Sequence, residues 1–542
     1  MATIESRGRE RDRDRQRDGE RGRDGEREHD GGFGPFVENL RRLPENLRDS
    51  FFRHGRPETD RTRSQTIFSN LFLHLHSTRV NVRTLRFSTT WAMGMASLSF
   101  FLILVATGIL LMVYYKPSID QAYDSIKDIH YVVPTGRFIR NIHRWAAHLM
   151  VVTVLVHMVR VFFTASYKKP REFNWLVGMV LFVLTLGLSF TGYLLPWDQL
   201  AYWAITIGAN IAGSPRELTD AIGITGFFDP GGFQKRLLLG ANAVGQEALI
   251  RFYLLHVMVL PLALAMVAGI HFWRIRKDGG LGRPDGPPTA AGKGSAIPGS
   301  VPAAPSEAPR KTYGLMCIVR DRTPAVNVDP ADTIPAWPYV LRAELFVLMA
   351  CAAACLVLGL FWNAPLKELA NPAVPENPAK APWYFLGLQE MVSYSAFVGG
   401  MVIPAIAILG LGLIPFLDRE REQAGVVLSG PRGRRIAAQS ALFALVAAVL
   451  AVAIPVRFGW LRTWFPSIPQ IVIIALNPGT ILTALYAGWS LAILHRTGST
   501  RAAAIALFLC FLVGFVVLTF VGSELRGPNW GFYWSKSSWP VH

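Results

Sequence analysis

Four histidines within long apolar segments are the residues of this sequence most suited to redox chemistry. His143 and His157 lie 14 residues apart in one apolar segment, and His256 and His271 lie 15 residues apart in another. An α-helix turns by ~100° and rises ~1.5 Å per residue, so each pair returns to nearly the same helix face roughly 21 Å further along. Because a coordinating side chain inside a membrane is costly, its first interpretation is functional.

The spacing predicts two layers of facing imidazoles. If the two segments are parallel helices, His143 and His256 share an outer depth, and His157 and His271 share an inner depth. Two imidazoles from facing helices match the axial positions of a haem iron and leave it no open position for a substrate. The sequence therefore predicts two non-covalent haem b groups, each with two histidine ligands and able to relay electrons. A lone histidine in a span more often hydrogen-bonds a neighbouring helix, and His148, which points ~140° away from His143, receives no ligand role.

Small and basic residues support the same arrangement. Two further apolar segments carry glycines 14 residues apart, Gly94 with Gly108 and Gly178 with Gly192. Glycine lets helices approach closely, so these positions are expected to admit a haem plane at each depth. Basic side chains near the histidines are expected to neutralise haem propionates, with interfacial anchoring as the alternative. They are Arg140, Arg144 and Arg160.

The elements that must position these residues are long apolar helices. Of 542 residues, 51% are hydrophobic and 17% are charged, whereas soluble domains carry about 25% charged residues. This composition predicts an all-α polytopic membrane protein. Together with the histidine pairs and a Pro/Gly/Ala/Ser-rich stretch at 279–309, it predicts a four-helix diheme bundle followed by a second helical module. Nine segments come close to the ~20 residues that span a bilayer. They are 90–114, 141–164, 175–195, 250–273, 341–362, 399–417, 436–456, 470–494 and 502–522.

The distribution of charge predicts the orientation of these spans. The formal net charge is +17, but the basic residues lie between apolar runs rather than on one face, which favours a lipid membrane over nucleic acid. If the N-terminus is cytoplasmic, the inward loops carry 19 Lys and Arg and the outward loops carry 10. The chain has four cysteines and no CxxC or CxxCH motif, which argues against a disulfide scaffold, a cysteine-ligated metal site and a covalent haem.

The chain is expected to have six parts. A disordered charged tail, 1–32, precedes a cytoplasmic or interfacial segment, 33–90, which includes a short amphipathic helix near 71–76. The diheme module with four spans covers 91–278, and a cytoplasmic linker covers 279–340. A second module with three spans covers 341–456. Additional spans and an external tail occupy 457–542.

As a set, the motifs resemble cytochrome b of the Rieske/cytochrome b complexes. They are Arg140–Trp145 (RNIHRW), His157–Arg160 (HMVR), Lys168–Glu172 (KKPRE), Thr191–Gln199 (TGYLLPWDQ) and Arg251–His256 (RFYLLH). The histidine spacing and the PWDQ run resemble the photosynthetic plastoquinol–plastocyanin reductase branch most closely. The resemblance is dense over 85–280 and looser over 341–456, where Pro382–Phe385 and Ile414–Asp418 carry it.

The resemblance implies a function and partners. Quinol would be oxidised at an outer site, with one electron passing to a Rieske iron–sulfur protein and then to a c-type cytochrome or similar acceptor. The other electron would cross through the two haems to a quinone-reducing inner site, which makes a proton-translocating Q-cycle. The family further implies a homodimer within a multisubunit complex, here in a bacterial inner membrane. The outer site would be lined by Tyr193, Trp197, Pro382, Trp383 and Tyr384.

Three departures from the family pattern matter. The cysteine that fixes an extra haem in the photosynthetic branch is Ala92 here, so that thioether cannot form. The family often reads Pro-Glu-Trp-Tyr at the outer site, but this chain reads Ala381-Pro382-Trp383-Tyr384 and lacks the glutamate. The two modules are fused and followed by extra spans. Glu390, two helical turns beyond Trp383, is the predicted replacement proton acceptor, with a structural hydrogen bond or a water-facing position as the alternative.

Two other functional classes compete with a quinol-oxidising core. A diheme membrane anchor would link a dehydrogenase or hydrogenase to the quinone pool, but it leaves Pro382–Tyr384 and the second module unexplained. A transporter with intramembrane histidines as proton relays would bind no haem. The reduced-minus-oxidised optical spectrum separates the transporter from the two haem proteins, and co-purification of a Rieske protein separates those two.

Overall fold

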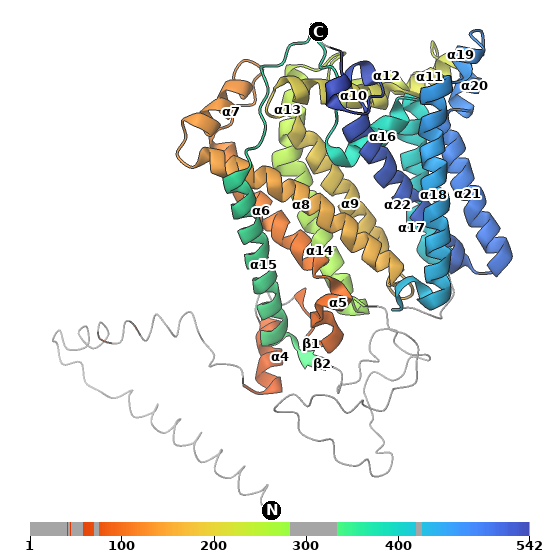
Figure 1. Ribbon diagram of the computed structural model, residues 1–542. Helices are drawn as coiled ribbons and strands as arrows, with labels where there is room; N and C mark the ends of the chain where they lie inside the picture. The colour runs from red at the N-terminus through yellow and green to blue at the C-terminus, as the bar shows by residue number, and fades with distance from the viewer. Residues whose placement is uncertain are drawn as a thin grey trace, which may run out of the picture. The chain divides into compact units, whose positions relative to one another are not determined.

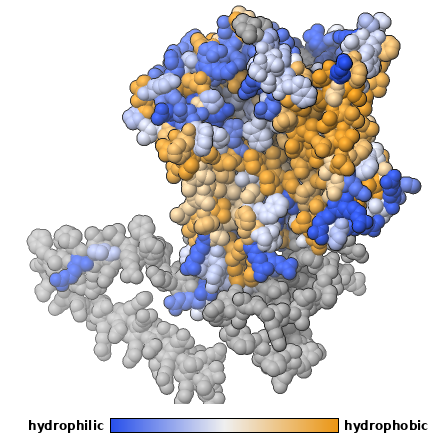
Figure 2. All heavy atoms as spheres, viewed as in Figure 1, coloured by the Kyte–Doolittle hydropathy of each residue, from blue (hydrophilic) through white to orange (hydrophobic). Residues whose placement is uncertain are grey.

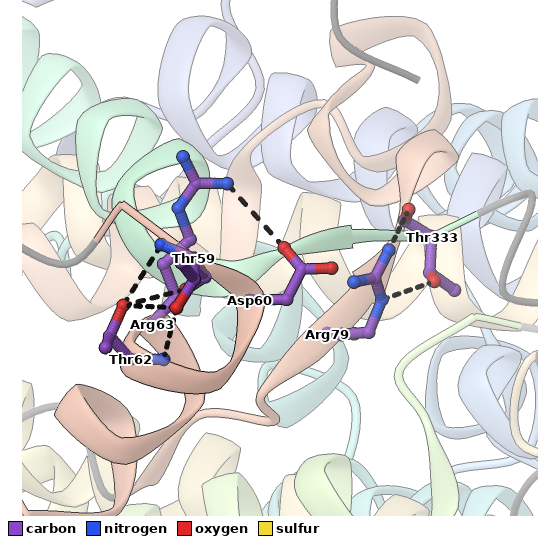
Figure 3. Close-up of polar contacts among 6 residues, drawn as sticks. All are labelled: Thr59, Asp60, Thr62, Arg63, Arg79 and Thr333. Carbon is purple, nitrogen blue, oxygen red and sulfur yellow. Dashed lines mark hydrogen bonds and ion pairs between the residues drawn. The ribbon is translucent and has the colours of Figure 1, made fainter. Parts of the chain in front are cut away.

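The computed structural model describes residues 58–69, 75–281, 333–418 and 425–540, together with Arg41 and Pro44. The chain divides into two compact units, Met1–Arg63 and Ser64–His542. The predicted tail 1–32, residues 282–332 of the predicted linker with Cys317, and residues 71–74 of the predicted amphipathic helix lie outside the described residues. In the first unit, Thr59 and Thr62 hydrogen-bond each other, and Arg63 pairs with Asp60 at the start of a helix (Figure 3).

The predicted all-α fold is confirmed. Only two three-residue strands, β1 and β2, form a sheet among the described residues. The first half contains α4 Asp60–Ser69, β1 Arg79–Asn81, α5 Phe87–Thr90, α6 Met93–Tyr114, α7 Ala122–Tyr131, α8 Gly136–Phe163, α9 Glu172–Tyr193, α10 Gln199–Gly213, α11 Pro215–Ala221, α12 Pro230–Leu239, α13 Gln246–Leu254, the π-helical turn η4 Leu255–Val259 and α14 Leu260–Asp278. The second half contains β2 Thr333–Pro335, α15 Ala336–Phe361, α16 Trp383–Val392, η6 Val398–Val402, α17 Ile403–Leu417, α18 Gly430–Phe458, α19 Leu461–Trp464, α20 Gln470–Ala475, α21 Pro478–Thr497, α22 Thr500–Phe520, η8 Val521–Leu525 and the short turns η9 Pro528–Trp530 and η10 Lys536–Ser538.

Eight helices of the described residues are long and apolar enough to cross a membrane, against the nine spans predicted. The difference lies at the predicted span 470–494. There the chain breaks between α20 and α21, where the Asn477 side chain caps a new helix and Pro478 supplies its first residue. Proline is favoured at the first helical position because its missing N–H has no helical partner there. α21 has 20 residues but is not among the eight; it nevertheless packs against α18 and α22.

In the first bundle, each helix that carries predicted histidines packs along one of the other two spans. α6 packs along α8, and α9 packs along α14, with further contacts between α8 and α9 (Figure 1). α15 packs against both α6 and α8, and α17 packs against α9, so helices of the second half lie directly on the first bundle. α18, α21 and α22 contact one another, and the Phe508 ring of α22 stacks on the Phe162 ring of α8 at 4.0 Å. The predicted division into modules at 279–340 stays a prediction.

The connections between spans lie at two opposite ends. α7, α10–α12, α19 and α20 lie at the upper end in Figure 1, and β1 and β2 lie at the lower end. Between these ends the visible surface is a hydrophobic band, with hydrophilic residues above and below it (Figure 2). Many large apolar side chains in the band are exposed, for example Phe346 and Met349 on α15, as expected for a surface in contact with lipid.

At the lower end, segments far apart in the sequence are joined by polar contacts. β1 pairs with β2, and the Arg79 guanidinium donates to the Oγ1 and the carbonyl of Thr333 (Figure 3). The α8–α9 connection, the end of α17 and the start of α22 are joined by a buried network. In it, Tyr167 donates to Asp418 at 2.5 Å and Arg501 donates to Tyr167 at 2.8 Å. Lys168 pairs with the same carboxylate at 3.1 Å. Burial raises the pKa of the Tyr167 hydroxyl, so it is neutral and able to donate.

The arrangement predicts the result of a topology experiment. A reporter inserted after Lys169 should be cytoplasmic, and reporters near Asp229 and Glu376 should be external, because the basic loops lie at the end that carries Lys169. The measurement is reporter activity or accessibility in intact cells. Reporters at Lys169 and Asp229 on the same side would contradict the fold, and exchanged sides would contradict the predicted orientation.

Candidate functional site

The four predicted histidines form two facing pairs between α8 and the continuous helix made by α13, η4 and α14. The ring centres of His143 and His256 lie 6.3 Å apart, and those of His157 and His271 lie 6.5 Å apart. A metal–imidazole bond is about 2 Å long and the nitrogen lies about 1 Å from the ring centre, so one metal ion between two imidazoles requires about 6 Å. Both pairs therefore fit a shared iron, and the pairing by depth is the one that the spacing predicts.

The π-helical turn η4 accounts for the unequal histidine spacing. η4 contains His256 and is followed directly by Pro261 in the first turn of α14. Proline has no N–H to continue the regular hydrogen-bond ladder, and a π-turn accommodates one extra residue in the helix. The 15-residue interval on this continuous helix therefore matches the 14-residue interval on α8, which is α-helical throughout.

Each predicted glycine faces one predicted histidine. A Cβ at Gly108 would lie 3.3 Å from Cε1 of His143, and a Cβ at Gly192 would lie 2.4 Å from Cε1 of His256. At the inner depth, the corresponding distances are 3.2 Å from Gly94 to His157 and 3.9 Å from Gly178 to His271. The glycines thus give each imidazole room against the neighbouring helix, which is a more specific role than general helix packing.

The outer pair of histidines is oriented by hydrogen bonds at Nδ1. Thr107 Oγ1 lies 2.9 Å from Nδ1 of His143, and the Leu188 carbonyl lies 3.1 Å from Nδ1 of His256. A hydrogen bond at one ring nitrogen fixes the tautomer and leaves the other nitrogen for a metal. At the inner depth, Nδ1 of His157 is buried without a hydrogen-bond partner among the described residues. His143 and His256 are therefore held at Nδ1, whereas no described residue holds His157 there.

The three predicted propionate-binding arginines have defined protein contacts. Arg140 is buried and donates to the carbonyls of Ala364 and Pro365, at 2.9 and 2.6 Å. The Arg160 guanidinium donates to the Thr89 carbonyl at 3.1 Å. Arg144 lies close to Tyr193 at the outer end of α9. Propionate binding by these three residues stays a prediction.

The predicted quinol-site residues gather around the start of α16. Trp383 donates its indole N–H to Nδ1 of His148 at 3.1 Å, and the Tyr384 ring lies 6.2 Å from the His148 ring. Tyr384 lies close to Ser189 on α9, one turn from Tyr193. Burial raises the pKa of the Tyr384 hydroxyl, so this residue is a neutral hydrogen-bonding group.

The remaining predicted residue, Trp197, holds the segment that leads to this site. We call residues 364–385 the outer segment. The Trp197 carbonyl accepts from Ala370 N, and both Asp198 carboxylate oxygens accept backbone N–H groups, from Ala201 and Lys367. The amide of Gln199 binds the backbone of the outer segment at Asn371 and Val374. The PWDQ run is therefore a docking site for the outer segment.

Glu390 is fully buried and forms an ion pair with Arg526. Arg526 donates to both carboxylate oxygens, at 2.9 and 2.5 Å, while Trp530 and Tyr394 donate at 3.0 and 3.1 Å. Burial and the neighbouring carboxylate raise the pKa of the Tyr394 hydroxyl. Glu390 as proton acceptor stays a prediction, but this role would require the ion pair to open.

The C-terminal tail also contacts α16 and the outer segment, and the sequence alone does not predict these contacts. Residues 526–533 fold back on themselves through backbone bonds between Gly527 and Gly531 and between Tyr533 and Leu525. Asn529 exchanges hydrogen bonds with Asn377, and Lys380 donates to the Ser523 carbonyl. The tail therefore binds both α16 and the outer segment.

The comparisons with known proteins agree with the geometry of the first bundle. The family described as Cytochrome b/b6/petB matches residues 80–279. Cytochrome b6 of Heliobacterium mobile is 46% identical over 189 residues, which are 35% of this chain and 83% of that protein. Cytochrome b6 of Prochlorococcus marinus (strain MIT 9515) is 43% identical over 189 residues, or 35% of this chain and 81% of that protein.

The second half is compared by structure. A chain of the structure titled "Hyperthermophilic respiratory Complex III" matches with a TM-score of 0.52 and 24% sequence identity. The match covers 80% of this chain and 91% of that chain. At this identity the likeness shows the fold, and its extent indicates that the fold is shared well beyond residue 279.

A matched pair of glycine substitutions tests the histidine layers. Gly192→Ala should weaken or abolish the outer haem, because the new Cβ must displace His256 from its Leu188 bond, at a cost of about 1–3 kcal/mol. Gly178→Ala should retain the inner haem, since its Cβ meets His271 at an ordinary contact distance of 3.9 Å. The measurement is the reduced-minus-oxidised spectrum of each purified variant. Equal effects of the two substitutions would contradict the geometry.

A second substitution tests the buried ion pair. Glu390→Gln should lower stability by roughly 3–5 kcal/mol, because it leaves the Arg526 charge buried without its partner. Combining it with Arg526→Met should recover part of this loss, since the charge is then removed as well. Thermal unfolding of the purified proteins measures both effects. A single variant as stable as the parent, or a double variant less stable than the single, would refute a structural ion pair.

Proposed function

The chain belongs to the cytochrome b/b6 family, and on this premise we propose that it is the diheme core of a quinol–cytochrome c (or similar acceptor) reductase. The observation that carries the proposal is the pair of histidine layers, each with a ring separation suited to one iron. His143 and His256 would hold the outer haem, and His157 and His271 the inner one. When bound, the haems would pass single electrons across the membrane.

We propose that the protein residues divide into ligands, spacers and a quinol site. Gly94, Gly108, Gly178 and Gly192 make room for the imidazoles. Thr107 orients His143, and the Leu188 carbonyl orients His256. Quinol would bind near Tyr193, Trp383 and Tyr384, where aromatic side chains from α9 and α16 gather beside α8. The PWDQ run and the tail hold the outer segment in place, so water-excluding contacts at this site depend on both.

The proposed reaction is a Q-cycle. Quinol gives one electron to a Rieske iron–sulfur protein and the other to the path toward the inner end, where a quinone is reduced. Protons are released outside and taken up inside, which makes the enzyme a proton-translocating membrane subunit. The partners would be the Rieske protein, a c-type cytochrome or similar acceptor and a second copy of the chain. The proposed location is a bacterial inner membrane, with the N-terminus in the cytoplasm.

The outer segment favours this function over a diheme membrane anchor. In this chain the segment is held from both sides, by the PWDQ run and by the C-terminal tail. An anchor that passes electrons from a dehydrogenase or hydrogenase to quinone leaves this segment and its aromatic residues unexplained. Co-purification of a Rieske protein with the tagged chain would support the reductase, and co-purification of a dehydrogenase in its place would refute it.

Alanine substitutions of the ligands test the proposed haem sites. His143→Ala and His256→Ala should each remove the same outer spectral component and leave the inner one, because each haem takes one ligand from each of the two histidine-bearing helices. His157→Ala and His271→Ala should do the converse. The reduced-minus-oxidised spectrum of membrane-inserted protein is the readout. Loss of different components in His143→Ala and His256→Ala would overturn the pairing.

A further inference from the structure

The outer site lacks the glutamate that the family pattern places there, and the nearby carboxylates are already hydrogen-bonded to other groups. Pro382 occupies the position of that glutamate and has no titratable group. Glu390 is held by Arg526, Trp530 and Tyr394. Asp198 accepts backbone N–H groups with both oxygens. A proton released from quinol therefore needs another acceptor at this site.

His148 is a titratable side chain at this site that has no role in the proposed function. His148 belongs to α8, and its ring is neighboured by Trp145 at 5.8 Å and Tyr384 at 6.2 Å. Its Nδ1 accepts the Trp383 indole N–H at 3.1 Å. Trp383 directly follows Pro382, so the imidazole contacts the residue next to the missing glutamate. His148 also lies five residues from His143 on a different face of α8, away from the proposed iron.

Building on the proposed function, we propose that His148 takes the quinol proton that the missing carboxylate would otherwise take. The neutral imidazole has a lone pair at Nδ1, and in this structure the Trp383 indole N–H occupies it. A quinol hydroxyl binding among these aromatic rings would replace the indole N–H as the donor to Nδ1. The imidazole thus offers an acceptor whose position is fixed by α8 and whose neighbours are aromatic surfaces suited to a flat ring.

The proton and electron balance of the step is complete. The O–H bond of one quinol hydroxyl breaks, and its proton moves to Nδ1 of His148, which becomes an imidazolium. Loss of this proton leaves an electron pair on the quinol oxygen, and one electron of the pair passes to the Rieske iron–sulfur protein, which is the oxidant in the proposed function. The other electron follows the path toward the inner end, and the second hydroxyl proton leaves to external water, so that quinone remains. The imidazolium then releases its proton to external water, which returns the acceptor to its neutral form.

The charged and titratable groups around His148 define how its protonation will respond to pH. Arg144 lies on the same helix, one turn earlier, and interacts with Tyr193 on α9. Tyr384 faces the imidazole from α16, and Asp198 lies near Tyr193. Since only a neutral imidazole can accept a proton, quinol oxidation should slow as pH falls through the range in which His148 becomes protonated.

The direct test replaces the imidazole by a group of similar shape that cannot carry a proton. In His148→Asn, the amide oxygen takes the place of Nδ1 and still accepts from Trp383. Both haems should remain in the spectrum of the assembled complex, while quinol oxidation should slow by about 10- to 100-fold, the range of a lost proton-transfer group. The decline of the rate at low pH should disappear with the histidine.

Restoring the glutamate provides a matched rescue. Pro382 has φ −51° and ψ 147°, an extended conformation that glutamate also adopts. His148→Asn combined with Pro382→Glu should recover at least part of the lost rate, because a carboxylate then stands beside the same aromatic residues. Trp383→Phe provides a further readout: it removes the N–H that favours the neutral imidazole, so the acidic decline should move to higher pH.

The outcomes separate this inference from the proposed function. Wild-type membranes without a two-haem spectrum or quinol oxidation would refute the proposed function itself. Wild-type activity that persists unchanged in His148→Asn, with the same pH profile, would overturn only the role of His148. Loss of a haem in His148→Asn and in His148→Gln would show that the residue is structural and would likewise overturn the proposal. A slow His148→Asn enzyme that Pro382→Glu rescues would support it.

Discussion

The close approach of glycines to imidazoles is the constraint on which the first bundle depends. Each histidine pair needs about 6 Å between ring centres to share one metal ion, so the helices that carry the rings cannot move closer or further apart. The neighbouring helices α6 and α9 must then pass the rings without a side chain in between. Gly94 and Gly108 satisfy this on α6, and Gly178 and Gly192 satisfy it on α9. The π-turn at His256 adjusts the fourth span to the same two depths.

In the second half of the chain, the outer segment carries the aromatic residues Trp383 and Tyr384 of the proposed quinol site. This segment contains little regular structure before α16, so contacts with its neighbours must define its position. Gln199 and Asp198 bind it from the first bundle, and Asn529 binds it from the C-terminal tail. The ion pair between Glu390 and Arg526 attaches the same tail to α16. Removing one member of a buried ion pair is costly, which makes this attachment a structural requirement for the aromatic residues at the outer site.

The sequence predicts the parts of this structure that follow a helical period. Apolar length indicates the spans. Intervals of 14 and 15 residues between histidines, and of 14 residues between glycines, predict two layers at matching depths. Two features lie beyond such reasoning because they depend on contacts between distant residues. Glu390 meets Arg526 across 136 residues, and His148 meets Trp383 across 235 residues. The break at Pro478 was missed because the apolar residues continue on both sides of it, although the Asn-Pro pair is itself a helix-start signal.

We propose that each chain binds two haems, each through two histidines. Haem quantification combined with electron paramagnetic resonance of the purified, oxidised protein tests this claim most directly. The geometry predicts two non-covalent haems per chain, both with the low-spin signal of an iron that has two imidazole ligands. One haem per chain, or a high-spin signal from either haem in intact protein, would contradict it.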